Sequence, residues 1–134
     1  MPRLASPRRA FAEALVSGGG RADETGSAFM KMIYVTLNNA DEARAIARAL
    51  LERQAAVCCN WFPITCAYRW EGEIVEEPEV VLLVKTRAEL TETVEGIVKA
   101  AVSYTNCIAR ISPDAVNSAF LDWLNREVPV GPAC

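Results

Sequence analysis

The fold is decided by residues 65–85, which read TCAYRWEGEIVEEPEVVLLVK. Two arms, residues 65–70 and 73–85, flank a turn that contains Gly72. Because glycine permits the backbone conformation of a tight turn, the stretch predicts a long β-hairpin. Pro78 has no N–H group to donate to a neighbouring strand, so we expect an edge or a bulge there. Residues 80–84 are apolar throughout, which is typical of a strand covered on both faces.

Upstream of the hairpin, the pattern predicts a strand, a helix and an apolar run of strand type. Residues 32–37 are rich in β-branched and aromatic side chains and are followed by two asparagines. Asn39 is a suitable N-cap for a helix, with Asp41 and Glu42 favourably placed in its first turn. Residues 55–60 then form an apolar run of strand type. The helix is indicated by apolar residues at helical spacing, namely Ala43, Ile46, Ala47, Leu50 and Leu51.

Downstream of the hairpin, we expect two more helices around a fourth strand. Thr86 and Glu89 form a candidate capping box for the first of these helices. Residues 107–111 read as the fourth strand, and Ser112-Pro113-Asp114 is expected to open the last helix. The apolar helical positions are Leu90, Val94, Ile97, Val98 and Ala101 in the first, and Val116, Phe120, Trp123 and Leu124 in the last.

The expected element order is β-α-β-β-α-β followed by a closing helix. Two crossover helices on one face of a four-stranded sheet make a ferredoxin-like α+β domain, here with an extended hairpin between the second and third strands. Such a sheet leaves its other face open. Because large exposed apolar patches usually mark interfaces, we expect the last helix or other subunits to cover that face, and we predict a homo-oligomer. The aromatic residues around the hairpin are Trp61, Phe62, Tyr68 and Trp70.

The chain divides into three parts by composition. Residues 1–29 contain four arginines and three consecutive glycines and show little apolar periodicity. We interpret them as a disordered extension or a misassigned start, in preference to a transit peptide, because Glu13, Asp23 and Glu24 are unusual in such leaders. Residues 30–128 form the domain, and residues 129–134 form a short tail.

Composition limits the partners and the compartment. A net charge of −3 argues against nucleic acid as the main partner, since such proteins normally carry a basic stripe. No apolar stretch approaches the roughly 20 residues that a membrane span needs. The five cysteines are odd in number and match neither a disulfide framework nor a zinc motif, which favours a reducing, cytoplasmic compartment. They are Cys58, Cys59, Cys66, Cys107 and Cys134.

Several short motifs, taken together in order and spacing, carry a resemblance. Residues 32–128 resemble the CutA family of divalent-cation tolerance proteins. The resemblance implies a ferredoxin-like homotrimer that takes part in the response to metal ions and binds copper or another divalent metal. The motifs are Ile33-Tyr34-Val35-Thr36, Ala43 and Ala47, Cys58-Cys59-Asn60, Pro63, Tyr68-Arg69-Trp70-Glu71-Gly72-Glu73, Lys85-Thr86, Ser103-Tyr104 and Phe120-Leu121-Asp122-Trp123.

The resemblance points to Cys58 as the candidate metal ligand, because thiolate is a soft ligand that suits Cu(I). Val102 and Thr105 stand where the family commonly has a histidine and an acidic residue, and the chain contains no histidine, so an imidazole site is excluded. Cys66 and Cys107 are candidate partners for Cys58. Packing of reduced thiols is the competing interpretation for every cysteine. Carboxylates offer a second route to harder ions, or only a solvated strand edge, at Glu71, Glu73, Glu76, Glu77 and Glu79.

The resemblance also implies that four aromatic residues lie at subunit contacts or in the cleft between subunits: Tyr68, Trp70, Tyr104 and Trp123. Ordinary interface packing and a small-molecule pocket are both compatible with that position. The leading function is therefore a non-enzymatic trimer involved in metal homeostasis. The alternative is a signalling or adaptor trimer, similar to nitrogen-regulatory PII proteins, that binds a small effector. An enzyme with Cys58 as nucleophile is disfavoured because no histidine is present as its base.

Overall fold

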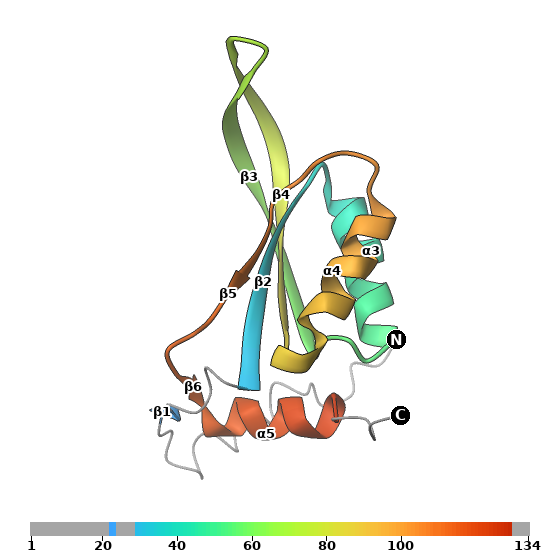
Figure 1. The fold of residues 1–134 in the computed structure, drawn as a ribbon, viewed down its shortest axis with the longest axis vertical. Helices are drawn as coiled ribbons and strands as arrows, with labels where there is room; N and C mark the ends of the chain where they lie inside the picture. Colours follow the sequence, from blue (N-terminus) through green and yellow to red (C-terminus); the bar gives the residue numbers. More distant parts are fainter. Residues whose placement is uncertain (1–21, 24–28, 130–134) are drawn as a thin grey trace, which may run out of the picture.

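The computed structural model describes residues 22–23 and 29–129. Four strands form an antiparallel sheet in the order β3-β4-β2-β5, and a separate two-stranded pair joins β1 to β6. The helices α3 and α4 lie on one side of the larger sheet, while α5 crosses its end (Figure 1). The elements are β1 (Ala22–Asp23), β2 (Met30–Leu37), α3 (Ala40–Glu52), β3 (Cys58–Trp70), β4 (Glu73–Arg87), η1 (Ala88–Leu90), α4 (Thr91–Ala101), β5 (Ile108–Ile111), β6 (Val116–Asn117) and α5 (Ser118–Glu127).

The main core lies between the sheet and the two helices on its covered face. Ile33, Val35 and Leu37 alternate along β2 and are fully buried against α3 and α4. Asn39 caps α3 as expected, since its side-chain oxygen accepts a hydrogen bond of 2.9 Å from the backbone N–H of Glu42. Leu51 departs from the predicted apolar face and is 44% exposed. The buried positions of α3 are Ala43, Ile46, Ala47 and Leu50.

The predicted hairpin is longer than expected, because β3 runs unbroken through Pro63 from Cys58 to Trp70. Its register with β4 continues without a bulge from the pair Cys58–Lys85 to the pair Trp70–Glu73. Glu71 (φ 49°) and Gly72 (φ 83°) form the turn, with the two positive φ angles that a two-residue hairpin favours.

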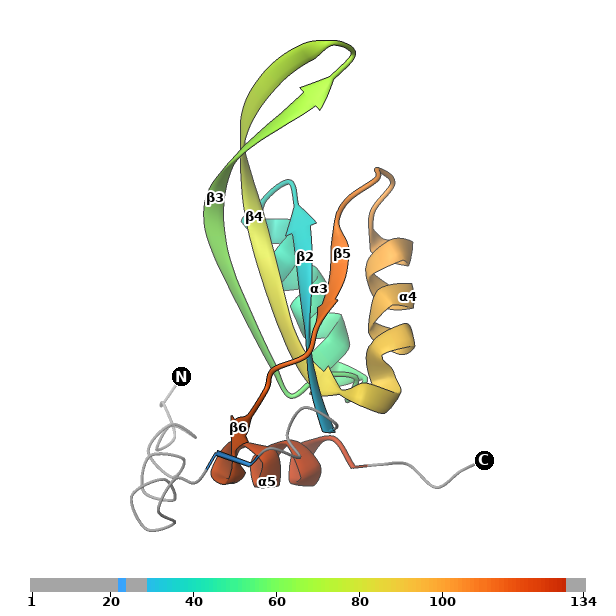
Figure 2. The ribbon, with the colours of Figure 1, turned by 60° about the vertical axis from the view of Figure 1, so that its left-hand side comes forward.

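The outer half of the hairpin is a two-stranded ribbon. β4 pairs with β2 only between Val80 and Arg87, so among the described strands residues 73–79 pair with β3 alone. Pro78 lies in this ribbon and therefore at an edge, which is one of the two alternatives expected from the sequence. The ribbon rises well beyond the rest of the domain and curls at its tip (Figure 2).

Two predicted helix starts were wrong, for identifiable reasons. Thr86 does not cap a helix, because it is fully buried at the end of β4 and its hydroxyl donates to the carbonyl oxygen of Ala55. A 3₁₀ turn follows, and α4 begins only at Thr91. The last helix begins at Ser118 and not near Ser112, since residues 116–117 stay extended to pair with residues 22–23.

A second cluster of buried side chains, here called the α5 cluster, forms where α5 crosses the end of the sheet. Its buried members are Met30, Val57, Leu121, Leu124 and Val128. The face of the sheet opposite α3 and α4 is covered by α5 at this end. On the same face, Phe62 is 44% exposed and Ile111 is 41% exposed. Most of residues 1–29, and residues 130–134, lie outside the described residues, so the expectations for those segments stay expectations.

Candidate functional site

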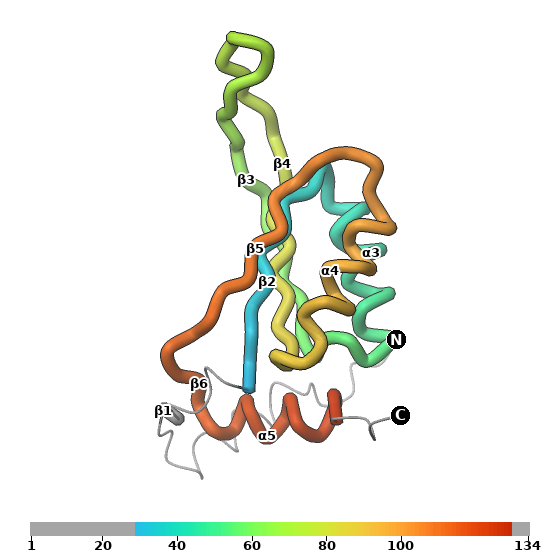
Figure 3. Tube along the Cα trace, in the orientation of Figure 1, coloured from blue at the N-terminus to red at the C-terminus, as the bar shows by residue number. Residues whose placement is uncertain are grey.

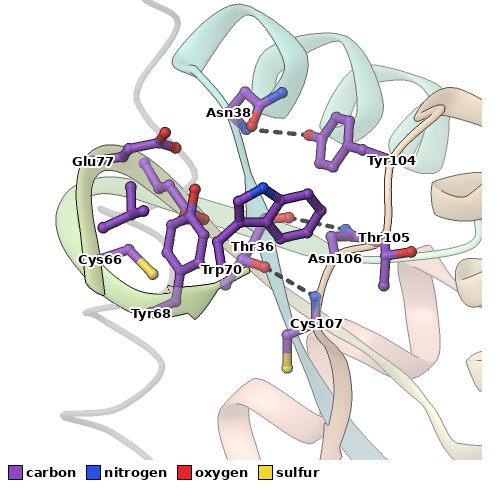
Figure 4. A pocket seen from close by; sticks show the side chains of 12 residues that line it. Thr36, Asn38, Cys66, Tyr68, Trp70, Glu77, Tyr104, Thr105, Asn106 and Cys107 are labelled. Atoms are coloured by element: carbon purple, nitrogen blue, oxygen red, sulfur yellow. Dashed lines mark hydrogen bonds between the residues drawn. The ribbon is translucent and has the colours of Figure 1, made fainter. Parts of the chain in front are cut away.

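A pocket of about 800 Å³ lies between the hairpin and the segment that joins α4 to β5. That segment runs from the top of α4 back toward the base of the hairpin (Figure 3). Tyr68, Trp70 and Tyr104, three of the four predicted cleft residues, line the pocket together (Figure 4). The lining residues are Thr36, Asn38, Cys66, Tyr68, Trp70, Val75, Glu77, Glu79, Tyr104, Thr105, Asn106 and Cys107.

The strand register explains why these side chains meet. Successive residues of a strand point to opposite faces, so Cys66, Tyr68 and Trp70 share one face of the ribbon. Their partners in β4 on that face include Val75 and Glu77. This face continues the open face of the sheet, where Thr36 lies between the buried residues Val35 and Leu37. The pocket is therefore built on the side away from α3 and α4.

Tyr104 fixes the far wall of the pocket. Its hydroxyl donates a hydrogen bond of 2.9 Å to Glu42 Oε2 and accepts one of 3.2 Å from the backbone N–H of Asn38. The same N–H also donates to Glu42 Oε1 at 3.0 Å. Burial, followed by the hydrogen bond to Glu42, raises the pKa of Tyr104 to about 12. The phenol is therefore a neutral donor at ordinary pH.

The segment after Tyr104 is held to β2 by three further hydrogen bonds, all to Thr36. Asn106 Nδ2 donates to the carbonyl oxygen of Thr36 at 2.9 Å, and the backbone N–H of Cys107 donates to its hydroxyl at 3.0 Å. The backbone N–H of Thr36 in turn donates to the carbonyl oxygen of Cys107 at 3.1 Å. The wall formed by residues 104–107 is thus pinned to the sheet, whereas the hairpin wall is held by its own ladder.

The hairpin wall carries the charge of the pocket. A hydrogen bond with Glu79, followed by partial burial, raises the pKa of the Cys66 thiol. Desolvation, followed by a hydrogen bond with Glu77, raises the pKa of Tyr68. Both groups are therefore held in their neutral forms. Of the described residues that line the pocket, Glu77 and Glu79 are acidic and none is lysine or arginine.

Cys58 lies away from this pocket. It begins β3, eight residues before Cys66, which corresponds to roughly 26 Å along an extended strand. Cys58 is half-buried and packs beside the α5 cluster, whereas Cys59 packs against the core on the other face. Burial raises the pKa of Cys59 to about 12, with smaller effects from Cys58 and Lys85, so Cys59 is a poor thiolate ligand.

Trp123, the fourth predicted cleft residue, is also separate from the pocket. It packs against the α5 cluster, and its ring meets that of Phe120 edge to face at 5.5 Å. It lines a smaller cavity of about 410 Å³ with Leu51, Gln54 and Glu127 among others. Its predicted place at a subunit interface stays a prediction.

The described residues hold no ready-made metal centre, because no three candidate donor side chains gather among residues 22–23 and 29–129. The acidic run noted in the sequence is divided by strand alternation: Glu77 and Glu79 line the pocket, and Glu76 lies on the opposite face of the ribbon. Sequence reasoning missed Thr36, Asn38 and Asn106 as pocket residues. Only the asparagine pair after the first strand gave a local signal, and that signal indicated a helix cap.

Comparison with known proteins finds a matching family model and similar proteins. The family model described as CutA1 divalent ion tolerance protein matches residues 31–127. A divalent-cation tolerance protein CutA of Archaeoglobus fulgidus is 42% identical over 97 residues, which cover 72% of this chain and 95% of the relative. The corresponding protein of Thermus thermophilus is 40% identical over 99 residues, covering 72% and 96%.

Solved structures agree with the sequence comparison. A structure of CutA from Archaeoglobus fulgidus, described as a periplasmic divalent cation tolerance protein, superposes with a TM-score of 0.71 at 41% identity, covering 74% of this chain and 98% of that one. CutA from Synechococcus elongatus gives a TM-score of 0.76 at 28% identity, covering 81% and 96%. In the part of the chain that the structure describes, no helix has the length and apolarity to cross a membrane.

Proposed function

The chain belongs to the CutA family of divalent ion tolerance proteins, and on that premise we propose that it is a non-enzymatic homotrimer that takes part in the response to divalent metal ions. Each subunit would be a ferredoxin-like domain, consistent with the strand order β3-β4-β2-β5 and with α3 and α4 on one face. The absence of histidine supports a role without catalysis, since Cys58 then has no imidazole base to activate it.

The open face of the sheet is the observation that carries the proposed trimer. Among the described helices only α5 lies against that face, and it does so at one end. Phe62 and Ile111 stay 44% and 41% exposed there. Exposed apolar side chains gathered on one face are typical of a surface that associates. Three copies would bury this part of the sheet.

We propose Cys58 as the copper ligand of this assembly. Cys58 pairs with Lys85, which pairs in turn with Met32, so all three lie on the face opposite Ile33 and the core helices. Cys58 therefore lies on the face of the sheet that the trimer would bury, at the end where α5 packs. Since no three-donor group forms among the described residues of one chain, a thiolate site would draw Cys58 from more than one subunit. Sulfur ligation of this kind suits Cu(I).

Competition for Cu(I) tests the metal site. The reduced full-length protein is titrated against a coloured Cu(I) chelator, as wild type, Cys58→Ser and Cys107→Ser. We expect Cys58→Ser to lose copper binding and Cys107→Ser, the exposed-thiol control, to keep it. Copper binding by Cys58→Ser equal to that of wild type would remove Cys58 from the proposal. Light scattering should give three times the 14.6 kDa of the chain, and a monomeric mass would refute the trimer.

A second candidate function is an effector-binding trimer, similar to the nitrogen-regulatory PII proteins. The observation that favours it is the pocket of about 800 Å³, which falls within the size range of small-molecule sites. Residues 104–107 are pinned to β2, whereas among the described strands the outer half of the hairpin pairs only with itself, so a ligand could bias the position of the hairpin. We propose the cytoplasm as the compartment, on the basis of the unpaired cysteine pattern.

A further inference from the structure

The charge of the pocket restricts what it can bind. Glu77 and Glu79 line the hairpin wall, and the described lining residues include no lysine or arginine. Cys66, Tyr68 and Tyr104 are held neutral, as their raised pKa values indicate. A phosphate or carboxylate ligand would meet two carboxylates with no compensating cation. The pocket therefore disfavours nucleotides and other anions and favours a cation.

The remaining lining distinguishes an organic cation from a metal ion. Hard metal ions need several oxygen donors around them, and no group of three donors forms within residues 22–23 and 29–129. The hydrogen bond with Glu79 raises the pKa of the Cys66 thiol, which disfavours the thiolate that a soft metal ion would bind. The pocket is also much larger than a metal ion requires.

Aromatic side chains supply what an organic cation needs. Tyr68, Trp70 and Tyr104 line the pocket from both walls, and Figure 4 draws the indole of Trp70 in the space between Tyr68 and residues 104–107. Trp70 is 62% exposed, so its ring face is open to a ligand. Ammonium groups bind over aromatic faces, best over tryptophan, and the attraction grows when carboxylates lie nearby. An alkylammonium group matches both the charge and the rings.

We propose that this pocket binds a small organic cation, an amine or quaternary ammonium compound, with Trp70 and Tyr68 against the cationic group and Glu77 and Glu79 balancing its charge. The proposal rests on the second candidate function, because it names the ligand class of that effector site. It is independent of copper binding at Cys58, which lies ten residues before Tyr68 along β3.

Calorimetric titration of the full-length protein tests the proposal with choline and spermidine as cationic probes and ATP as the anionic one. We expect both cations to bind, more weakly at higher ionic strength, and ATP not to bind. Trp70→Leu should weaken choline binding by roughly 2- to 30-fold, the range of measured cation–π contributions. Because Trp70 is largely exposed, circular dichroism should show Trp70→Leu to be folded.

A matched pair of variants tests the carboxylates. The double variant Glu77→Gln, Glu79→Gln should lose most of the affinity for choline and spermidine. Glu76→Gln should keep it, since Glu76 lies on the other face of the same ribbon. An equal loss of affinity in Glu76→Gln would mean that overall charge alone accounts for the effect, and it would overturn the proposal. Binding of ATP without either cation would overturn it but leave the effector function standing. Binding of none of the three probes would refute both.

Discussion

Tyr104 and Glu42 are joined by a hydrogen bond of 2.9 Å, although 62 residues separate them in the sequence. Tyr104 precedes β5, and Glu42 lies in the first turn of α3. Asn38, which directly follows β2, donates its backbone N–H to both side chains. This contact therefore joins the segment between α4 and β5 to the start of the domain, at the wall of the pocket.

Removal of this hydroxyl should weaken the domain. Tyr104→Phe removes the hydroxyl that donates to Glu42 and leaves the carboxylate with the backbone N–H of Asn38 as its donor, so we expect a loss of about 1–2 kcal/mol in the free energy of unfolding. Urea denaturation at fixed protein concentration measures the loss. Thr105→Ser, an exposed change in the same segment, is the control. An equally stable Tyr104→Phe protein would mean that the contact does not hold the wall.

The same tyrosine predicts a dependence on alkaline pH. The pKa of Tyr104 is about 12 in the folded protein and about 10, the ordinary value, once the chain unfolds. Its contribution is therefore complete below pH 10 and is lost as the pH rises from 10 through 12. Tyr104→Phe has no hydroxyl group to titrate, so its stability does not show this loss. The stability gap between wild type and Tyr104→Phe should narrow over that interval in denaturation series; a constant gap would contradict the raised pKa.

Two glycines should respond to alanine in opposite directions. A Cβ atom would meet no heavy atom within 4 Å at Gly72 or at Gly96, so the backbone alone decides the effect. Gly72 has a φ of +83° in the hairpin turn, and Gly72→Ala should cost about 1 kcal/mol. Gly96 lies within α4, and Gly96→Ala should stabilise by about 0.5–1 kcal/mol. If both variants shifted the midpoint of thermal unfolding in the same direction, the backbone would not account for the two effects.

Two arginines test the difference between buried and exposed ion pairs. The side chain of Arg87 is 7% exposed, lies 3.3 Å from Glu89, and also donates to Asn125 and to the carbonyl oxygen of Val128. Arg87→Met should cost about 2–3 kcal/mol, because these hydrogen bonds fasten the end of α5. Arg48 pairs with Glu52 at 2.9 Å on the surface, with 80% of its side chain exposed.

Arg48→Met is the matched control and should cost at most about 0.5 kcal/mol. Chemical denaturation of both variants gives the comparison. Similar losses in the two would show that the contacts of Arg87 with α5 contribute little beyond a surface pair.

Local patterns were sufficient for most elements of the fold. The cap at Asn39, the apolar stripe of α3 and the glycine turn depend on residues within one or two turns of the chain, so they could be predicted from the sequence. The capping box at Thr86 was wrong because the hydroxyl is used by Ala55, 31 residues upstream. The start of the last helix was wrong because β6 pairs with residues 22–23. Neither long-range partner leaves a local signal.

The candidate site was predictable only in part. Tyr68, Trp70 and Tyr104 were expected together through the family resemblance, and the pocket brings them together within one chain. Periodicity could have separated Glu77 from Glu76, since they lie on opposite faces of one strand. The contacts of Thr36 with residues 106–107 could not be predicted, because they depend on how β5 is placed beside β2.

Because the register of the hairpin is unbroken, the number of residues in its turn determines which side chains of β4 line the pocket. With two turn residues, the even positions of β3 and the odd positions of β4 line the pocket. If one residue were inserted into the turn and β4 shifted by one residue against a fixed β3, Glu76 would take the place of Glu77, and Pro78 that of Glu79, on the pocket side. An odd change in turn length would thus remove one of the two negative charges of the pocket without altering any side chain, whereas an even change would preserve the pattern. Ligand preference in hairpins of this kind is therefore open to change by insertion as well as by substitution.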